Sequence, residues 1–392
     1  MLTQTLALLT DAYRELHAKK LFWITMVLSV FVVVAFSGFA LTPTGMSYWI
    51  WDFENRINSS LFPPELFYKF LFTNFAIPIW LTWAATILAL VSTASIIPDF
   101  LSGGAVELTL SKPISRVRLF LTKYCTGLLF VGLQVLAFSV GWFLLIGIRG
   151  KSWEPEIFLA VPIVLVFFSY LYCFCALFGL LTRSTIASLM LTIVVWLCLF
   201  GLNTTDGVFV TMRENTILKL EDKRDVVRRR EEWAQKRLDE MKANGEELPV
   251  PDGVMSTDTL EAINPMIRTG RKDVAELEKT RESRVRWAGI ISGVKTVFPK
   301  TQETVALLSR WMVSKEDMAM FQPGGGSNVR VNDREDAGEE AEDFEFGQHP
   351  KLGERIEAAK RNRTVGWVLG TSVAFEAALL VLCCWLFARR DF

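Results

Sequence analysis

Five long stretches of this 392-residue chain contain no charged residue. They are Leu21–Leu41, Phe70–Pro98, Tyr124–Ile148, Ile157–Thr182 and Ser184–Thr205, and a sixth stretch, Thr364–Ala388, contains only Glu376. A helix rises about 1.5 Å per residue, so about 20 apolar residues cross a hydrocarbon layer of about 30 Å. Inside that layer every backbone N–H and C=O group needs a partner within the protein. The stretches therefore predict six transmembrane helices rather than a barrel of short alternating strands.

The charged residues are concentrated in one segment. Residues 206–363 hold 59 of the 84 charged side chains, whereas the remaining 234 residues hold 25. The expected fold is an all-α integral membrane protein with a large polar, helical insertion between the fifth and sixth transmembrane helices. This pattern excludes an ordinary globular enzyme, a secreted disulfide scaffold and a disordered protein. The net charge of zero gives no reason to expect a nucleic acid as partner.

Cysteine and histidine give little sign of chemistry. All six cysteines lie inside apolar stretches, and His17 and His349 stand far apart in polar surroundings. A zinc site needs ligands at short, fixed spacings, so no metal site is predicted. Cys173 and Cys175 have the spacing to bind a soft metal, but small cysteines are common in buried helices, and that is the preferred interpretation. No catalytic residue is predicted.

The basic residues between the spans predict the orientation. With a cytoplasmic N-terminus, the cytoplasmic segments carry ten Lys and Arg residues and the short external loops carry four. Such residues accumulate on the cytoplasmic side of membrane proteins. We therefore expect a multi-pass protein of the plasma (inner) membrane with both termini in the cytoplasm. Residues 206–363 are expected outside, because long domains are translocated regardless of their charge.

This layout predicts four parts. They are an amphipathic cytoplasmic interfacial helix over residues 1–20, transmembrane helices 1–5 over 21–205 with a cytoplasmic loop at 99–123, the extracytoplasmic insertion over 206–363, and transmembrane helix 6 with a cytoplasmic tail over 364–392. The aromatic residues between 42 and 69 are expected to anchor that segment in the headgroup layer.

The insertion is expected to contain an antiparallel helical hairpin over 206–286, which is the expected site for any extracytoplasmic partner protein. Its first helix has a thin apolar stripe near period 3.5, in which Arg224 and Glu231 take positions expected to be apolar. Residues 287–321 predict short helices resting against the outer interface or the tops of the spans. The acidic run at 333–345 predicts a flexible linker.

Leu101-Ser102-Gly103-Gly104 matches the start of the signature sequence of ABC ATPases. An ATPase also needs a phosphate-binding loop of the form Gly-x-x-x-x-Gly-Lys-Ser/Thr, and the sequence contains none. We therefore expect no nucleotide site and no cofactor in this chain, and we do not expect it to be an enzyme.

The next residues, from Gly104 to Arg116, read Gly-Ala-Val-Glu-Leu-Thr-Leu-Ser-Lys-Pro-Ile-Ser-Arg, and the chain ends in Phe-Ala-Arg-Arg-Asp-Phe. Together with the six-span layout and Lys123 at the start of the third span, these segments resemble the membrane (permease) subunit of ABC transporters of the second exporter type. The resemblance implies a half-transporter that pairs with a second, identical or similar permease subunit. It also implies separate cytoplasmic ATPase subunits that bind ATP-Mg. The external insertion departs from the plain family pattern.

The resemblance makes the loop at 99–123 the element that receives the motion of the ATPase. The residues expected at this contact are Asp99, Glu107, Lys112, Pro113, Arg116 and Arg118. The arginines offer a fixed positive patch, Glu107 offers a counter-charge, and Pro113 stiffens a helix end. The alternative is that these arginines only anchor the cytoplasmic side of the spans.

Glu376 lies 13 residues from both Arg363 and Arg389, and is therefore expected near the middle of the bilayer. A charge there costs about 2.5–3.5 kcal/mol on insertion scales, so the side chain should face protein or water. Gln134 in the third span, or a Ser or Thr of a neighbouring span, is the expected partner. Glu376 lies either on a translocation or proton path or is a neutral, hydrogen-bonded packing residue. Both alternatives remain open at this point.

The expected function is that of a permease subunit that couples ATP hydrolysis by a separate subunit to export or conformational work. The alternative is a non-transporting membrane scaffold whose external hairpin binds envelope partner proteins. An intramembrane enzyme ranks last, because it would need a nucleophile–base pair or a metal within the spans.

Overall fold

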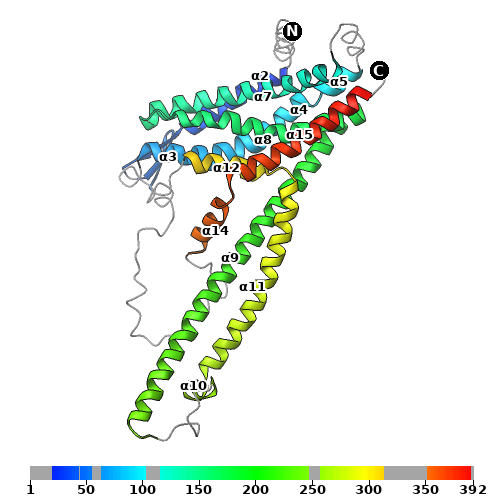
Figure 1. Ribbon diagram of the computed structural model, residues 1–392. Coiled ribbons are helices and arrows are strands. Elements are labelled where there is room, and N and C mark those ends of the chain that lie inside the picture. The colour runs from blue at the N-terminus through cyan, green and yellow to red at the C-terminus, as the bar shows by residue number, and fades with distance from the viewer. Residues whose placement is uncertain are drawn as a thin grey trace. The chain divides into compact units, whose positions relative to one another are not determined.

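The computed structural model describes residues 20–43, 45–54, 63–102, 115–246, 257–312 and 351–389. Helices make up nearly all of this described part (Figure 1). The predicted helix at 1–20 (except Lys20) and the predicted linker at 333–345 lie outside it.

The chain divides into two compact units. The bundle unit comprises Met1–Gly201, Val297–Arg330 and Val365–Phe392, and the hairpin unit comprises Leu202–Thr296 and Val331–Thr364. The boundary between Met1–Gly201 of the bundle unit and Leu202–Thr296 of the hairpin unit falls inside the helix α9 (Thr185–Ala243).

In the described part of the chain, six helical segments are long and apolar enough to cross a membrane, which confirms the prediction of a helical membrane protein with six candidate spans. They are Lys20–Ser37 (α2), Pro64–Leu101, Arg116–Gly150, Pro155–Thr182, Thr185–Ala243 (α9) and Val365–Arg389 (α15). Three of them are composite. The second contains α3 (Pro64–Leu71), η1 (Phe72–Ala85), α4 (Thr86–Thr93) and α5 (Ile96–Ser102), the third contains α7 (Arg116–Leu145) and η2 (Ile146–Gly150), and the fourth contains η3 (Pro155–Leu159) and α8 (Ala160–Thr182).

Ring contacts show that α2 and α7 run parallel. The Phe22 and Phe130 centroids lie 5.2 Å apart near one end, and the Phe36 and Trp142 centroids lie 5.2 Å apart near the other. The first and third of six successive crossings must have the same direction, so this pairing agrees with the predicted order of spans.

The α8 and α15 helices both run antiparallel to α7. Along α8, Tyr172 stacks on Tyr124 at 5.0 Å. On the segment that leads into α8, Phe158 lies 5.3 Å from Phe143. Along α15, the Phe387 ring lies 5.7 Å from Phe120, at the start of α7. The fourth and sixth spans thus oppose the third, as alternating crossings require.

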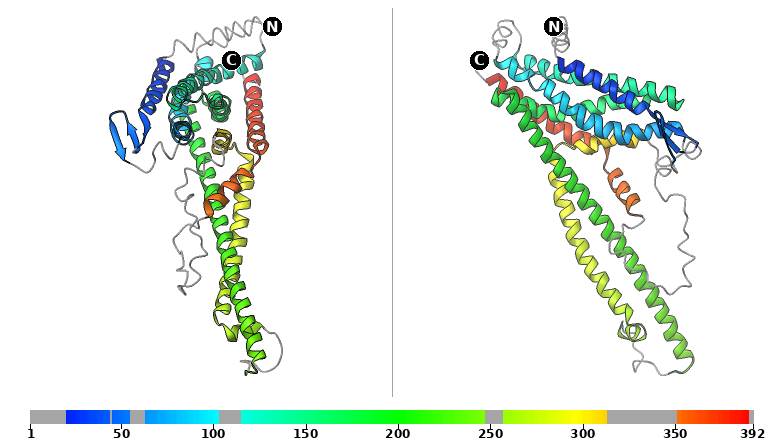
Figure 2. Two further views of the ribbon diagram at one scale, coloured as in Figure 1. Left: turned by 90° about the vertical axis from the view of Figure 1, so that its left-hand side faces the viewer. Right: turned by 180° about the vertical axis from the view of Figure 1, so that it is seen from behind.

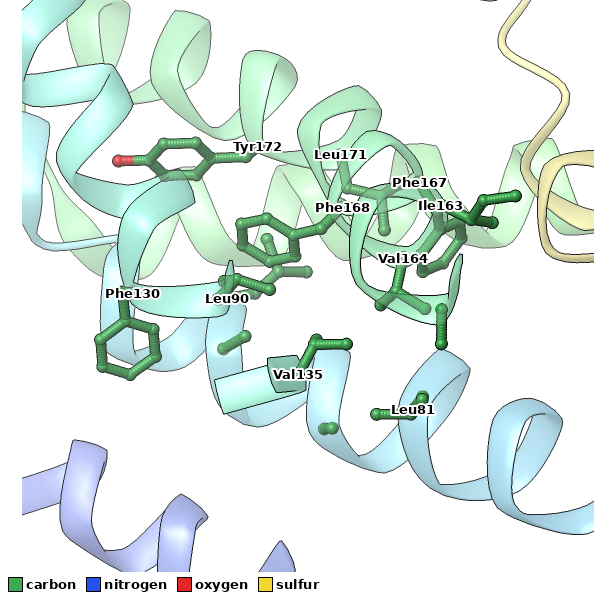
Figure 3. Close-up of a cluster of buried hydrophobic side chains, with 14 of the residues drawn as sticks. Leu81, Leu90, Phe130, Val135, Ile163, Val164, Phe167, Phe168, Leu171 and Tyr172 are labelled. Atoms are coloured by element: carbon green, nitrogen blue, oxygen red, sulfur yellow. The ribbon is translucent and has the colours of Figure 1, made fainter. Parts of the chain in front are cut away.

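The α8 helix forms the centre of the bundle unit. In the most apolar 18 residues of the span that contains α8, 67% are buried. The corresponding share is 17% for α2 and 22% for α9 and α15. Figure 3 shows its aromatic and branched side chains, including Phe167, Phe168 and Leu171, among those of neighbouring helices such as Leu90 and Val135. The outer helices keep many large apolar side chains exposed. In a membrane these side chains face lipid or another protein.

Part of the second span is a π-helix, η1. Pro78 lies inside it and has no N–H group to donate. The Thr82 and Thr86 hydroxyls donate to the carbonyl oxygens five residues earlier, Ile77 and Leu81, at 2.9 and 2.8 Å. These side-chain hydrogen bonds occupy carbonyl groups along the wider helix. This π-helix, which is 14 residues long, borders a cavity described below.

The first apolar stretch is shorter than predicted. The α2 helix ends at Ser37, and a three-stranded antiparallel sheet follows instead of further helix or a loop. Its strands are β1 (Phe39–Thr42), β2 (Gly45–Tyr48) and β3 (Trp51–Glu54). Trp49 adopts the left-handed conformation (φ 55°) in the turn between β2 and β3, and its backbone N–H donates to the Gly38 carbonyl at 2.9 Å. The predicted aromatic anchor at 42–69 therefore contains strands as well as the start of α3.

In the hairpin unit, the 202–243 part of α9 and α11 (Met266–Val297) form an antiparallel pair, seen from two sides in Figure 2. Lys223 pairs with Asp273 at 3.3 Å and Arg271 pairs with Glu231 at 2.6 Å, so rising numbers on one arm meet falling numbers on the other. A short helix, α10 (Thr257–Ile263), precedes α11. This geometry agrees with the predicted hairpin.

The two charged residues that interrupt the apolar stripe form ion pairs with the other arm of the hairpin. Arg224 forms an ion pair with Glu278, as Glu231 does with Arg271. The stripe itself is buried at Val227, Ala234 and Leu238. Each of these two charged residues, at a position expected to be apolar, thus has an opposite charge on the other arm.

The α12 helix (Thr301–Met312) belongs to the bundle unit and packs against α8, η1, η3 and α15. Its 12 residues rise about 18 Å, too little to cross about 30 Å of hydrocarbon. Just before it, the Lys300 backbone N–H donates to Ser372 Oγ, in the interior of α15, at 3.0 Å. The predicted short helix therefore enters the bundle instead of resting on the tops of the spans, while residues 287–297 belong to α11.

Candidate functional site

Three helices of the bundle unit meet at Glu376. The Tyr124 hydroxyl of α7 donates to Glu376 Oε1, and the Ser169 hydroxyl of α8 donates to Glu376 Oε2, both at 2.9 Å. Both carboxyl oxygens of this α15 side chain thus face protein groups, as the sequence predicted for a charged residue in this span. Ser169 belongs to the expected class of partner, a serine on a neighbouring span.

Aromatic packing holds Tyr124 in place. Its ring stacks on Tyr172 of α8 at 5.0 Å, and Tyr172 in turn stacks on Phe168 at 5.6 Å. A Cβ atom at Gly127 would lie 2.5 Å from the Tyr172 ring, so only glycine leaves room for this ring against α7. Sequence reasoning missed Tyr124, because it treated that residue as the boundary of the third span.

Gln134 does not take part in this cluster, which corrects the prediction that it might hold Glu376. Its side chain is buried in the bundle core, at 2% exposure. Among the residues that the structure describes, neither its amide nitrogen nor its amide oxygen has a hydrogen-bond partner. Unpaired buried polar groups are costly, so Gln134 is a second polar position of interest in the spans.

A lysine that precedes α12 contacts the helix that carries Glu376. Lys300 is fully buried, its ammonium group donates to the Thr371 hydroxyl, and it lies 4.3 Å from the centre of the Trp367 ring. Thr371 precedes Glu376 by five residues on α15. The chain segment that enters the bundle at α12 thus brings a basic group to the helix that carries Glu376.

A cavity of about 40 Å³ lies beside α12. Seven residues of η1, α8, α9 and α12 line it: Thr82, Trp83, Phe167, Trp196, Phe200, Thr301 and Gln302. Trp83 and Trp196 stack at 4.8 Å along one side. This volume has room for one or two water molecules.

The structure describes three of the six predicted ATPase-contact residues. Asp99 is exposed in the first turn of α5, while Arg116 and Arg118 lie on the first turn of α7. The Ser115 hydroxyl caps this helix by accepting from the Arg118 backbone N–H at 3.3 Å. The α7 helix therefore begins two turns before the predicted start of the third span, and the loop predicted at 99–123 is shorter. Glu107, Lys112 and Pro113 lie outside the described residues.

The end of α5, the start of α7 and the end of α15 gather at one end of the bundle unit. Arg116 Nη1 donates to the Ala388 carbonyl at 3.2 Å. Phe100 stacks on Phe387 at 6.3 Å, and Lys123 lies 5.6 Å from the Phe100 ring centre. The described ends of the two segments that carry the family resemblance, Arg116 and Ala388, are far apart in sequence and thus lie together.

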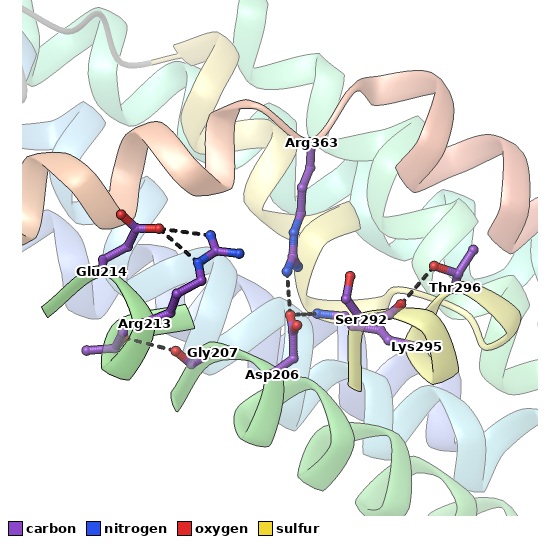
Figure 4. A network of polar contacts seen from close by, with 9 residues as sticks. Asp206, Gly207, Arg213, Glu214, Ser292, Lys295, Thr296 and Arg363 are labelled. Carbon is purple, nitrogen blue, oxygen red and sulfur yellow. Dashed lines mark hydrogen bonds and ion pairs between the residues drawn. The ribbon is translucent and has the colours of Figure 1, made fainter. Parts of the chain in front are cut away.

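The hairpin unit contains a buried ion cluster (Figure 4). Asp206 Oδ2 accepts from Lys295 Nζ and from Arg363 Nη2, each at 2.7 Å. The Asp206 and Lys295 side chains are only 3% and 2% exposed. Nearby, Arg213 and Glu214 pair at 2.8 Å. The sequence gives no local sign of this cluster, because Lys295 follows Asp206 by 89 residues.

No group of three or more His, Cys, Asp and Glu side chains in the described part of the chain is arranged to hold a metal ion. Cys175 contacts the Ser188 hydroxyl at 3.2 Å, and the Cys173 thiol donates to the Tyr170 carbonyl at 3.0 Å. The two cysteines thus contact helix groups on α8 and α9.

The chain matches no protein-family model, no curated protein and no solved structure.

Proposed function

We propose that this chain is the transmembrane permease subunit of an ATP-driven ABC exporter. The observation that carries the proposal is the joining of three segments at one end of the bundle unit, centred on the contact between Arg116 and Ala388. Arg116 ends one of the stretches that resemble exporter permeases, and Ala388 belongs to the other. In this proposal their shared face is cytoplasmic and receives an ATPase subunit that binds ATP-Mg.

The exposed charges at this face fit such a contact. Asp99 in the first turn of α5 is exposed, while Arg116 and Arg118 are half-buried at the start of α7. Motion applied here would reach α15 directly through the Arg116 hydrogen bond and the stacking of Phe100 on Phe387. The sixth span carries Glu376, so the same motion would reach the polar cluster in the spans.

The poorly buried outer helices fit a subunit that works in a pair. The α2, α9 and α15 helices expose apolar side chains such as Ile186, Val194 and Val381. Lipid covers some of these faces, and a second permease subunit covers others. The hairpin unit would then lie on the extracytoplasmic side and offer an envelope protein its ion-paired arms.

The test is co-purification of an ATPase with the full chain from its native membrane. Wild-type protein and Glu156→Lys, which reverses an exposed charge on η3, should retain the ATPase, whereas Asp99→Lys should lose most of it. If no ATPase associates with the wild type, or if Asp99→Lys retains it fully, the proposal is wrong. If the hairpin binds an envelope protein and no ATPase associates with the chain, the result favours the scaffold alternative.

A further inference from the structure

Four short oxygen–oxygen contacts surround Glu376, but the two hydroxyl groups involved supply only two protons. The Tyr124 oxygen lies 2.9 Å from Glu376 Oε1 and 3.1 Å from the Ser169 carbonyl. The Ser169 hydroxyl oxygen lies 2.9 Å from Glu376 Oε2 and 2.8 Å from the Val166 carbonyl. A hydroxyl group supplies one proton, and a carboxylate supplies none. If Glu376 is ionised, only two protons are available for these four contacts.

A proton on Glu376 improves this balance. The carboxylic acid then donates from Oε1 to the Tyr124 oxygen, and Tyr124 donates its own proton to the Ser169 carbonyl. Ser169 donates to Glu376 Oε2 or to the Val166 carbonyl. Three of the four contacts then hold a proton, and no acceptor-only carboxylate remains in the apolar span.

We propose that Glu376 is a proton-binding site, occupied at neutral pH, whose acid proton is donated to Tyr124. One protein hydroxyl contacts each carboxyl oxygen, and in this proposal the proton leaves when Glu376 separates from Tyr124 or Ser169. Release and rebinding of this proton therefore accompany a movement of α15 relative to α7 and α8. This inference does not depend on an ATPase partner.

The groups that face the site leave this assignment unchanged. On α7 it meets Tyr124, and on α8 Tyr170 and Cys173 lie close enough to interact with it electrostatically. All three side chains are uncharged in their ordinary forms at neutral pH. The cation Lys300, which precedes α12, contacts Thr371 and Trp367 on α15. Further along α15, Cys383 adds no charge in its ordinary form.

Infrared difference spectroscopy of the full-length protein in lipid nanodiscs at neutral pH tests the proposal. Wild type minus Glu376→Gln should show a carboxylic-acid carbonyl band that shifts on exchange into deuterated water. Wild type minus Glu354→Gln, which alters an exposed carboxyl on α14, should show carboxylate bands only. Tyr124→Phe should shift the acid band, because it removes the acceptor for the acid proton.

Glu376→Gln should keep its fold, since an amide can donate to Tyr124 and accept from Ser169 as a neutral acid does. Its melting temperature should match that of wild type, whereas Glu376→Ala should melt lower. The proposal is overturned if wild type minus Glu376→Gln shows a carboxylate band in place of the acid band. Should Glu376→Gln not fold, the same result in Tyr124→Phe minus wild type overturns it.

Discussion

The Lys295 ammonium group lies 2.7 Å from Asp206 Oδ2, and the same oxygen accepts from Arg363 at 2.7 Å. One carboxylate thus joins α9, α11 and the segment that precedes α15. Two cations share one anion in surroundings that leave Asp206 and Lys295 almost unexposed. The cluster stabilises the hairpin unit only while all three partners are present, because a buried charge that loses its partner remains desolvated.

Asp206→Ala should therefore destabilise the hairpin unit strongly, by about 3–5 kcal/mol. Hydrogen exchange of the backbone amides in 202–243 and 266–296 measures this loss locally. Glu232→Ala provides the control, because Glu232 is about two thirds exposed (64%) and makes only a long contact with Arg228 at 3.9 Å. Its effect should lie within about 1 kcal/mol. Equal effects of the two variants would contradict the account of the cluster.

Gly270 allows α11 to approach α9. A Cβ atom at this position would lie 2.6 Å from Val227 Cγ2. Gly270→Ala should thus cost about 1–3 kcal/mol by overpacking, although alanine favours helix. Val227→Ala in the same protein should recover part of that loss. Gly289→Ala on the same helix meets nothing within 4 Å and should stabilise the helix by about 0.5–1 kcal/mol. A destabilising Gly289→Ala, or no recovery in the double variant, would contradict this geometry.

Glu154 should make stability depend on pH. Burial raises the pKa of its carboxyl, but the hydrogen bond from Ser152 at 2.8 Å and the ion pair with Lys69 at 3.1 Å outweigh it, so the pKa lies below its ordinary 4.5. A lowered folded-state pKa means that the unfolded chain binds the proton first as the pH falls. This contribution is full at neutral pH and is lost as the pH falls below about 4.5 through the folded pKa.

Thermal unfolding between neutral and acidic pH measures this effect, with Glu154→Gln as the variant. Its melting temperature should fall below that of wild type at neutral pH, and the difference should shrink in acid. Glu156→Gln changes a neighbouring exposed carboxyl and should follow wild type. A difference between Glu154→Gln and wild type that stays constant over the whole pH range would rule out this ion pair as its cause.

The six spans could be predicted because their physics is local. The thickness of the hydrocarbon layer sets the length of an apolar run. Charge-free stretches of that length, such as Ile157–Thr182, can therefore be recognised in the sequence. Span ends could not be predicted as well. The α7 helix begins at Arg116, since a serine cap and basic side chains continue the helix beyond the apolar run. The sheet after Ser37 depends on pairing between strands, which an apolar count cannot reveal.

The polar sites could be predicted only in part. A single acid in an apolar span pointed to Glu376, because its cost inside lipid requires a partner. Its partners Tyr124 and Ser169 come from spans that lie 252 and 207 residues away, and only the fold brings them together. The same is true of Lys295 and Arg363 around Asp206. Ordinary-looking charges in a soluble segment give no hint of which ones become buried.

The central claim is that the end of the bundle unit near Asp99 faces the cytoplasm and that the hairpin faces outward. Single cysteines at Asp99 and Glu246, both exposed, can be placed in a chain whose six native cysteines are replaced. A thiol reagent that cannot cross membranes is then applied to sealed cells and to permeabilised cells. We predict labelling at position 246 in sealed cells and at position 99 only after permeabilisation. Labelling at position 99 in sealed cells, with position 246 protected, would contradict the account.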